Sequence, residues 1–247
     1  MLALSVCLAN LLWILQSGPA PAHAGSDSRQ MSRSVTLSVS IQVGQTVTLT
    51  WNAEGSSKVF ASWSGIVSPS GSTEVRPERT TTYTLLAEGE HGLISKTMTV
   101  EVRGGRGDDE LWPDPHLFDR FYISDKLAGI SFIDFANRIR QVLQDDLMCT
   151  VRTVEYDDKA RRLVLLTEFH QDYALVLPSE TNIRQRRIAY RVEAVQNDPA
   201  EHTIGYTVGS LIQRQLMRDA HWRIEPSEEV YRKANDRVRE GLTGSRR

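Results

Sequence analysis

A histidine between two carboxylates is the feature of this chain that comes nearest to acid–base machinery: Glu168, His170 and Asp172. Imidazole and carboxylate groups held within hydrogen-bonding reach can transfer protons near neutral pH. In a strand, however, Glu168 and His170 project to the same solvent-facing side while Phe169 turns toward the core, because side chains alternate between the two faces. We therefore interpret the segment as a polar strand end, and a hydrolase centred on His170 is the less favoured alternative.

Other catalytic chemistry is sparse in the sequence. Cys149 shares a strand face with Leu147 and Val151, which predicts a buried and inert thiol. The histidines are scattered and have neither His-x-His nor His-Glu-x-x-His spacing, so we expect no metal site and no cofactor. The chain also lacks a glycine-rich phosphate loop and a nucleophile elbow. These patterns predict a protein that is not an enzyme.

The densest basic patch is the candidate surface for a partner. Strand alternation places two of its arginines on the face opposite Ile188 and Tyr190, where they can meet acidic groups of another protein or simply face solvent. Elsewhere basic and acidic residues are interleaved and the net charge is −2, which argues against a nucleic-acid partner. The four predicted partner-binding residues are Arg184, Arg186, Arg187 and Arg191, of which Arg187 and Arg191 are the two on that face.

The N-terminus predicts export. An apolar run from Leu2 to Leu15 is too short to cross a bilayer comfortably, and it is followed by the small-residue site Ala22-His23-Ala24. We predict a signal peptide over residues 1–24 and a periplasmic protein, with an extracellular or cell-surface location as the alternative. No Lys or Arg precedes the apolar run, so an uncleaved anchor remains the second alternative. Cleavage would leave Cys149 without a cysteine partner for an intramolecular disulfide.

A chain of 247 residues is long enough for two domains with cores of their own. Residues 34–103 read as short strands divided by turns, as in the alternation of Val47, Leu49 and Trp51 with threonines. Such a pattern predicts an all-β sandwich.

The motif order of this module resembles the immunoglobulin-like repeats of bacterial secreted and surface proteins. The resemblance lies in Gly-Gln-x-Val-x-Leu-x-Trp at residues 44–51, Pro-x-x-Thr-Thr-x-Tyr-x-Leu at 77–85 and Thr-Val-x-Val at 99–102. It implies an immunoglobulin-like fold that serves as a spacer or as a binding platform.

Residues 104–116 are expected to form a linker, because they are rich in glycine and charge and carry Pro113 and Pro115. The segment contains Arg106-Gly107-Asp108, a tripeptide found in adhesive proteins. Chance matches of three residues are common, so we favour the linker. A cell-surface or secreted adhesive protein with an immunoglobulin-like module remains the alternative function.

Residues 117–247 predict a smaller α+β module with a helix, an antiparallel meander and C-terminal helices. Ser131 is a suitable N-cap with Asp134 three residues on, ahead of apolar residues at helical spacing. Gly241 is expected to end the last helix. The expected strands are 147–156, 161–169, 173–177, 188–194 and 202–208, and the expected C-terminal helices are 211–217 and a second one from residue 227.

Residues 122–195 resemble the curli production assembly/transport component of the CsgE type. The resemblance rests on Asp125, on Asp134-Phe135 in an amphipathic helix, on a hairpin with Ala160-Arg161 at its turn, and on the run 173–178 that ends in Leu-Pro. Residues 154–162 depart from it, because they lack the Pro, Trp and Gly of the family's conspicuous run. The resemblance implies a non-enzymatic periplasmic factor that forms a ring, binds unfolded amyloid subunits and docks on the outer-membrane secretion channel.

Overall fold

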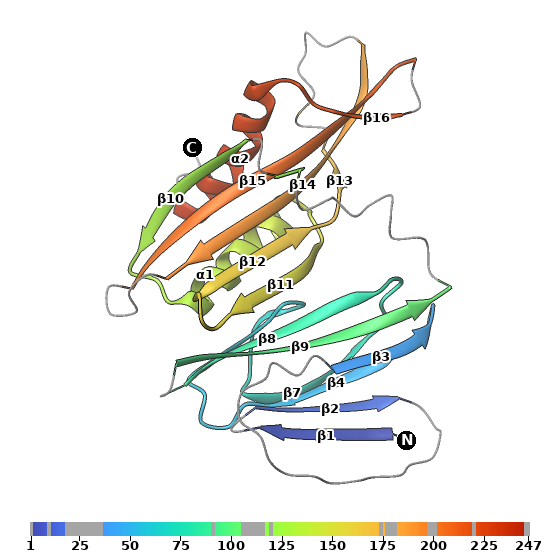
Figure 1. Ribbon diagram of the computed structural model, residues 1–247, viewed down its shortest axis with the longest axis vertical. Helices are drawn as coiled ribbons and strands as arrows, with labels where there is room; N and C mark the ends of the chain where they lie inside the picture. Colours follow the sequence, from blue (N-terminus) through green and yellow to red (C-terminus); the bar gives the residue numbers. More distant parts are fainter. Residues whose placement is uncertain are drawn as a thin grey trace. The chain divides into compact units, whose positions relative to one another are not determined.

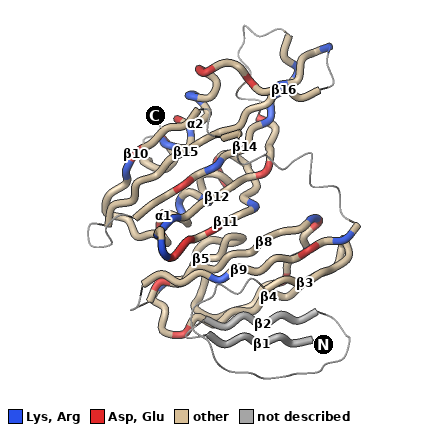
Figure 2. The backbone as a smooth tube through the Cα atoms, viewed as in Figure 1, with Lys and Arg blue, Asp and Glu red and all other residues tan. Residues whose placement is uncertain are grey.

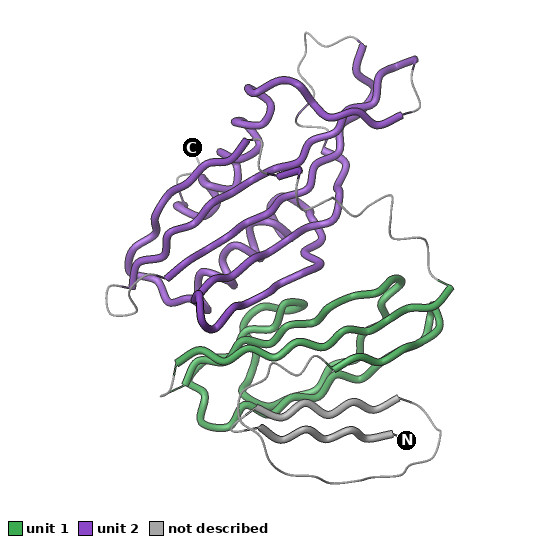
Figure 3. The backbone as a smooth tube through the Cα atoms, in the orientation of Figure 1, with its two compact units in different colours: residues 1–108 green, residues 109–247 purple. Residues whose placement is uncertain are grey.

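The computed structural model is mostly β-sheet with two α-helices (Figure 1). It separates into two compact units, Met1–Asp108 and Asp109–Arg247, which are described one at a time (Figure 3). Their boundary lies inside residues 104–116, the expected linker. The structure describes residues 37–89, 92–104, 117–118, 121–172, 175, 182–196, 202–218 and 221–244, together with the backbone of two N-terminal strands.

Unit 1 contains two sheets. One has the strand order β1-β2-β4-β7, and the other has the order β3-β9-β8-β5-β6, in which β3 runs parallel to β9 and the remaining neighbours are antiparallel. The strands are β1 (Leu2–Leu8), β2 (Leu11–Ser17), β3 (Leu37–Gln42), β4 (Val47–Asn52), β5 (Lys58–Ala61), β6 (Gly65–Val67), β7 (Ser70–Val75), β8 (Thr81–Gly89) and β9 (Gly92–Arg103).

The core of unit 1 lies between these sheets. Val47, Leu49 and Trp51 of β4 are buried in one cluster with Tyr83 and Leu85 of β8, while the threonines of β4 are half-buried. The predicted alternation of apolar and polar residues in β4 is therefore confirmed. The Trp51 indole also donates a hydrogen bond to the Ser68 carbonyl over 2.9 Å, so its polar edge is satisfied within the core.

The predicted signal peptide falls mainly outside the residues whose side chains are described. The backbones of β1 and β2 cover most of the apolar run, and β2 pairs antiparallel with β4. Residues 22–24, the expected cleavage site, lie outside the described residues. Export and cleavage therefore stay predictions.

Unit 2 is built on a sheet with the order β10-β15-β14-β12-β11, to which two short strands are added: β13 beside β14 and β16 beside β15. All of its pairings are antiparallel. The strands are β10 (Tyr122–Ala128), β11 (Val151–Asp157), β12 (Arg162–Thr167), β13 (His170–Gln171), β14 (Ile183–Val195), β15 (Thr203–Leu216) and β16 (Trp222–Ile224).

Helices α1 (Phe132–Gln141) and α2 (Glu228–Thr243) lie on the same side of this sheet (Figure 1). A π-helical turn over Val142–Asp146 continues α1. Tyr190 of β14 donates a hydrogen bond to the Ala234 carbonyl of α2 over 3.4 Å. The helices therefore cover the face to which the even-numbered residues of β14 and β15 point, and these residues form the core of the unit.

The start of α1 agrees with the sequence prediction. The Ser131 hydroxyl accepts a hydrogen bond from the Asp134 backbone N–H over 3.2 Å and donates one to the Asp134 carboxylate over 2.9 Å. This reciprocal pairing satisfies one of the N–H groups that every helix start leaves without an intrahelical acceptor.

Three expectations for unit 2 are wrong, and one strand was missed. Residues 147–150 precede β11 and are not strand, because the π-helical turn is capped at Leu147 and Met148 has φ 56°. Residues 211–217 do not form a helix: up to Leu216 they extend β15, because pairing with β14 buries their alternate side chains. Gly241 does not end the last helix, which continues to Thr243 and is capped by Gly244 at φ 71°. Strand β10 was not predicted at all. The described residues thus hold one C-terminal helix, and the run 173–177 lies outside them except for Leu175.

Candidate functional site

The side of the unit 2 sheet opposite α1 and α2 is the candidate site, and we call it the helix-free face. The register of β14 with β15 places Arg187 opposite Gln213, Ala189 opposite Leu211, and Arg191 opposite Gly209 on this face. Among the described residues its centre is a small apolar cluster of Phe118, Leu166, Ala189 and Leu211, with Phe169 packed against it.

Arg187 lies between two aromatic rings beside this cluster. Its guanidinium carbon is 4.4 Å from the ring centroid of Phe169 and 4.4 Å from that of Trp222. Its Nε donates a hydrogen bond to Gln213 over 2.8 Å. A cation stacked on both sides loses little further freedom when a ligand arrives. We call Phe169, Arg187 and Trp222 the aromatic–arginine band.

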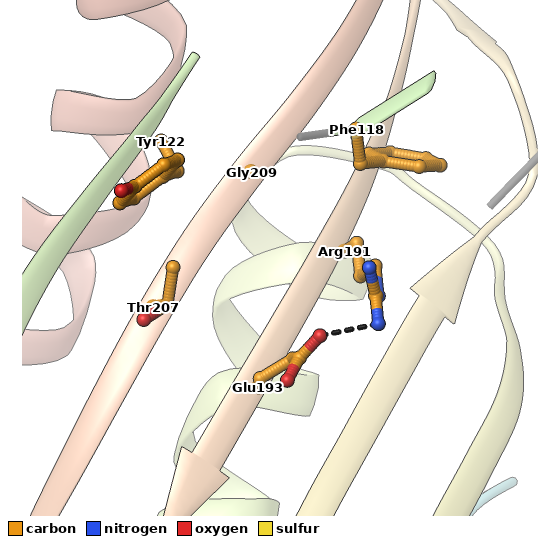
Figure 4. A pocket seen from close by; sticks show the side chains of 6 residues that line it. All are labelled: Phe118, Tyr122, Arg191, Glu193, Thr207 and Gly209. Atoms are coloured by element: carbon orange, nitrogen blue, oxygen red, sulfur yellow. Dashed lines mark ion pairs between the residues drawn. The ribbon is translucent and has the colours of Figure 1, made fainter. Parts of the chain in front are cut away.

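The other end of the helix-free face is hollow. A cavity of about 260 Å³ is lined by Phe118, Tyr122, Arg191, Glu193, Thr207 and Gly209 (Figure 4). Arg191 and Glu193 form an ion pair across its floor, and Arg162 reaches the Glu193 carboxylate over 3.8 Å. The face therefore combines aromatic rings with paired charges.

The four predicted partner-binding arginines do not form one patch. Arg187 and Arg191 both lie on the helix-free face, at the two ends just described, whereas Arg184 is exposed apart from them. Arg186 is wrong as a partner-binding residue, because its side chain is buried on the opposite face. There its Nε donates to Glu225 over 2.8 Å and its Nη1 to the Leu175 carbonyl over 2.7 Å.

Sequence reasoning missed the aromatic members of the face. Trp222, Phe118 and Tyr122 come from segments that were not predicted as strands or sites, and the sheet brings them next to Arg187 and Arg191. The available signal was weak: in Tyr122–Ala128 only Ile123 and Leu127 are half-buried and the other residues are exposed, so the stretch lacks the two-residue alternation that marks a strand.

The structure separates the two carboxylates of the candidate acid–base segment, and it does not place Glu168 and His170 on a solvent-facing strand side as predicted, because both are half-buried and β12 ends at Thr167. Glu168 lies 3.6 Å from Arg152 in an ion pair, whereas Asp172 is buried and accepts a hydrogen bond from Arg237. The pairing of β13 with β14 places His170 opposite Ile188. The carboxylates of Glu168 and Asp172 therefore pair with different arginines.

Cys149 is buried, and its thiol lies 3.4 Å from the Leu147 carbonyl. Burial, assisted by the negative charge of Asp172, raises the pKa of the thiol from 9.0 to about 12. Since the thiolate is the reactive form, this environment is the opposite of what a nucleophile needs. The prediction of a buried thiol is confirmed, but the strand face shared with Leu147 and Val151 is not, because Cys149 precedes β11.

Within the part of the chain that the structure describes, no group of three or more His, Cys, Asp or Glu side chains is placed to hold a metal ion. None of the helices there has the length and apolar character that crossing a membrane requires. Basic and acidic positions are interspersed along the described backbone of both units (Figure 2). Arg106, Gly107 and Asp108 lie outside the described residues.

A β-rich chain with two α-helices is the class that the described residues define. No protein-family model matches the sequence, and no curated protein matches it. Among solved structures, the crystal structure of a TBP-like protein from Parabacteroides distasonis is similar at 11% identity with a TM-score of 0.32. The match covers 50% of this chain and 88% of that one, and a similarity at this level carries no argument about function.

Proposed function

We propose that this protein is a non-enzymatic accessory factor of the periplasm, which binds the subunits of curli-type amyloid fibres and assists their secretion. The helix-free face of unit 2 is the binding surface in this proposal. The observation that carries it is the aromatic–arginine band, where Arg187 is stacked 4.4 Å from each of two rings on the face that the helices leave uncovered. The resemblance of residues 122–195 to the CsgE type supplies the class of client.

The composition of the band suits a protein partner. Tryptophan and arginine are enriched among the residues that dominate protein–protein binding energies. Arg187 is already held by Phe169, Trp222 and Gln213, so a client would meet a preorganised surface. Docking on the outer-membrane channel and assembly into a ring belong to the same proposal and rest on the resemblance alone.

The edges of the sheet offer a second mode of contact. Among the described residues, β10 pairs only with β15 and β11 pairs only with β12, so each has one side where an extended segment could add by backbone hydrogen bonds. Asp125 and Lys126 on β10 and Glu155 on β11 put charges along these edges. Such charges oppose unlimited strand addition, as a factor that handles amyloid subunits requires.

We further infer that unit 1 is an immunoglobulin-like sandwich and that unit 2 is an α+β module. Two sheets that share a core with a buried tryptophan support the first inference. A single antiparallel sheet with two helices on one face supports the second. In this proposal unit 1 is a spacer or platform that carries the binding unit.

Thioflavin kinetics of an amyloid curlin test the proposal with the full chain. Substoichiometric to equal amounts of the protein should lengthen the lag without added cofactor, because covering extended segments removes the template on which fibrils grow. Charge reversal of Arg187 and Arg191 to Glu should shorten the lag again, and more strongly at low salt.

Arg232→Glu is the matched control, because Arg232 is exposed on α2 and therefore lies on the covered side of the sheet. It should leave the lag of the wild-type mixture unchanged. An unaltered lag in the presence of folded wild-type protein would refute the proposal and leave the adhesive alternative in front. Equal loss of inhibition in Arg232→Glu would show attraction by overall charge instead of by the helix-free face.

A further inference from the structure

The cavity on the helix-free face is smaller than most small-molecule sites. Its volume of about 260 Å³ lies below the range of about 300–1,000 Å³ that is usual for small-molecule sites. Figure 4 shows Phe118 and Arg191 on one side of it and Tyr122 and Thr207 on the other. A cavity of this volume has room for one side chain of a bound polypeptide together with part of its backbone.

The cavity exists because residue 209 is glycine. Tyr122 lies directly opposite Gly209 in the pairing of β10 with β15, and its side chain is 63% exposed. A Cβ added at Gly209 would lie 3.1 Å from the Phe118 carbonyl oxygen and 3.6 Å from the Phe118 Cβ, so any side chain would crowd the floor between the two rings. Strand β15 thus leaves a gap at Gly209, and the rings of Phe118 and Tyr122 flank it.

The charges of the cavity are balanced. Arg191 and Glu193 are paired with each other, and a second arginine, Arg162, lies 3.8 Å from the Glu193 carboxylate. A carboxylate ligand would compete with Glu193 for Arg191 and would be repelled by Glu193. An ammonium ligand would compete with Arg191 for Glu193 and would be repelled by Arg191. A neutral ligand that both accepts and donates hydrogen bonds can use the two groups without separating them.

We propose that this cavity binds the primary amide of a glutamine or asparagine side chain in an extended polypeptide. The amide oxygen accepts a hydrogen bond from Arg191, the amide NH2 donates to Glu193, and the flat amide lies beside the rings of Phe118 and Tyr122. The identification of that polypeptide as an amyloid subunit rests on the proposed function. The recognition of an amide rests on the cavity alone.

Four short host peptides that differ at one central position test this selectivity: Gln, Glu, Lys or Met. They have the same backbone and similar length at the variable side chain, so only the terminal group changes. Binding is measured on the full chain from the shifts of backbone amide signals around Gly209 in ¹⁵N-labelled protein. The Gln peptide should bind about tenfold more tightly than each of the others, as expected for hydrogen bonds to charged groups.

Two variants should redirect the preference in opposite senses. Glu193→Gln leaves Arg191 as the charge of the floor, so the Glu peptide should become the tightest ligand. The double variant Arg162→Gln/Arg191→Gln leaves Glu193 without either arginine, so the Lys peptide should become the tightest. Arg239→Gln removes an arginine that pairs with Asp236 on α2, away from the cavity, and should preserve the preference for Gln.

Equal affinities for the four peptides, or a preference for Gln that survives both floor variants, would overturn the proposal. Tightest binding of the Met peptide would also overturn it and identify a purely apolar pocket. Failure of the amide site can be distinguished from failure of the proposed function. If the protein delays fibril growth but does not discriminate among the peptides, the proposed function is supported and the amide site is refuted. If the protein prefers the Gln peptide but does not delay fibril growth, the amide site is supported and the amyloid client is refuted.

Discussion

Arg186 is the largest fully buried side chain of the described chain, and its ion pair with Glu225 joins β14 to the segment before α2. The Glu225 carboxylate also accepts a hydrogen bond from the Ser227 backbone N–H over 3.0 Å, next to the start of α2. A buried charge without its counter-ion is far less stable than either the intact pair or two apolar groups.

Arg186→Met should therefore lower the free energy of unfolding of unit 2 by about 3–5 kcal/mol, because Glu225 would remain buried without its main partner. The double variant Arg186→Met/Glu225→Leu should recover part of this loss, although the contact with Ser227 is then missing as well. Urea denaturation followed by circular dichroism measures both values. A double variant less stable than Arg186→Met would show that Glu225 stabilises the unit independently of Arg186.

Cys149 makes the stability of unit 2 fall at alkaline pH. Its folded pKa of about 12 is higher than the ordinary value of 9.0, so the folded state holds the proton that the unfolded state releases. The stabilisation is fully present below about pH 9 and is lost as the pH rises toward 12. Cys149→Ala should flatten the fall in that window, which denaturation at several pH values would reveal. In the wild type, iodoacetamide at about pH 8 should leave the thiol unmodified until urea unfolds the chain.

At the scale of the element, two glycines near the end of α2 have different physical roles. Gly244 adopts φ 71° at the C-cap, a conformation that favours glycine. Gly241 lies inside the helix, where an added Cβ would lie 2.8 Å from both γ-carbons of Val142. One glycine is required by the backbone and the other by a close approach between α2 and the turn after α1.

Substitution of either glycine by alanine should destabilise the unit, by about 1–2 kcal/mol at Gly244 and about 1–3 kcal/mol at Gly241. Val142→Ala should relieve the effect of Gly241→Ala but not that of Gly244→Ala, because only the former is a steric clash with Val142. A double-mutant cycle from thermal or urea unfolding measures this coupling. Arg232→Ala, at an exposed site of α2, should change stability by less than about 0.5 kcal/mol.

At the scale of the whole molecule, the division at Asp108 and Asp109 predicts two unfolding units. A fragment that ends at Gly104 should melt at the same temperature as unit 1 does in the full chain, because each unit has a core of its own. Calorimetry of the fragment and of the full chain tests this. A clear drop in the melting temperature of the fragment would show that unit 2 stabilises unit 1.

The N-terminal pattern predicts that exported protein begins at Gly25, after Ala22-His23-Ala24. Intact-mass analysis of protein recovered from the periplasm checks this directly. A product that retains residues 1–24 would support the uncleaved anchor, and removal at another position would move the site away from Ala24.

The amino-acid sequence by itself determined the local features of this protein. The alternation in β4 and the Ser131 cap of α1 follow from periodicity and side-chain chemistry within a few residues, and both were predicted. The placement of Arg187 and Arg191 on one strand face follows from the same two-residue repeat.

Only the tertiary structure decided which of these residues form a site. Residues 211–216 read as helical by themselves, and pairing with β14 makes them strand, because long-range burial outweighs weak local propensity. Arg186 is next to Arg187 in the sequence, but its side chain points to the opposite face of β14 and is buried beneath the helices. Tyr122 reaches the helix-free face by pairing with Gly209, and Trp222 meets Arg187 there; both contacts join residues far apart in the chain and leave no local signal.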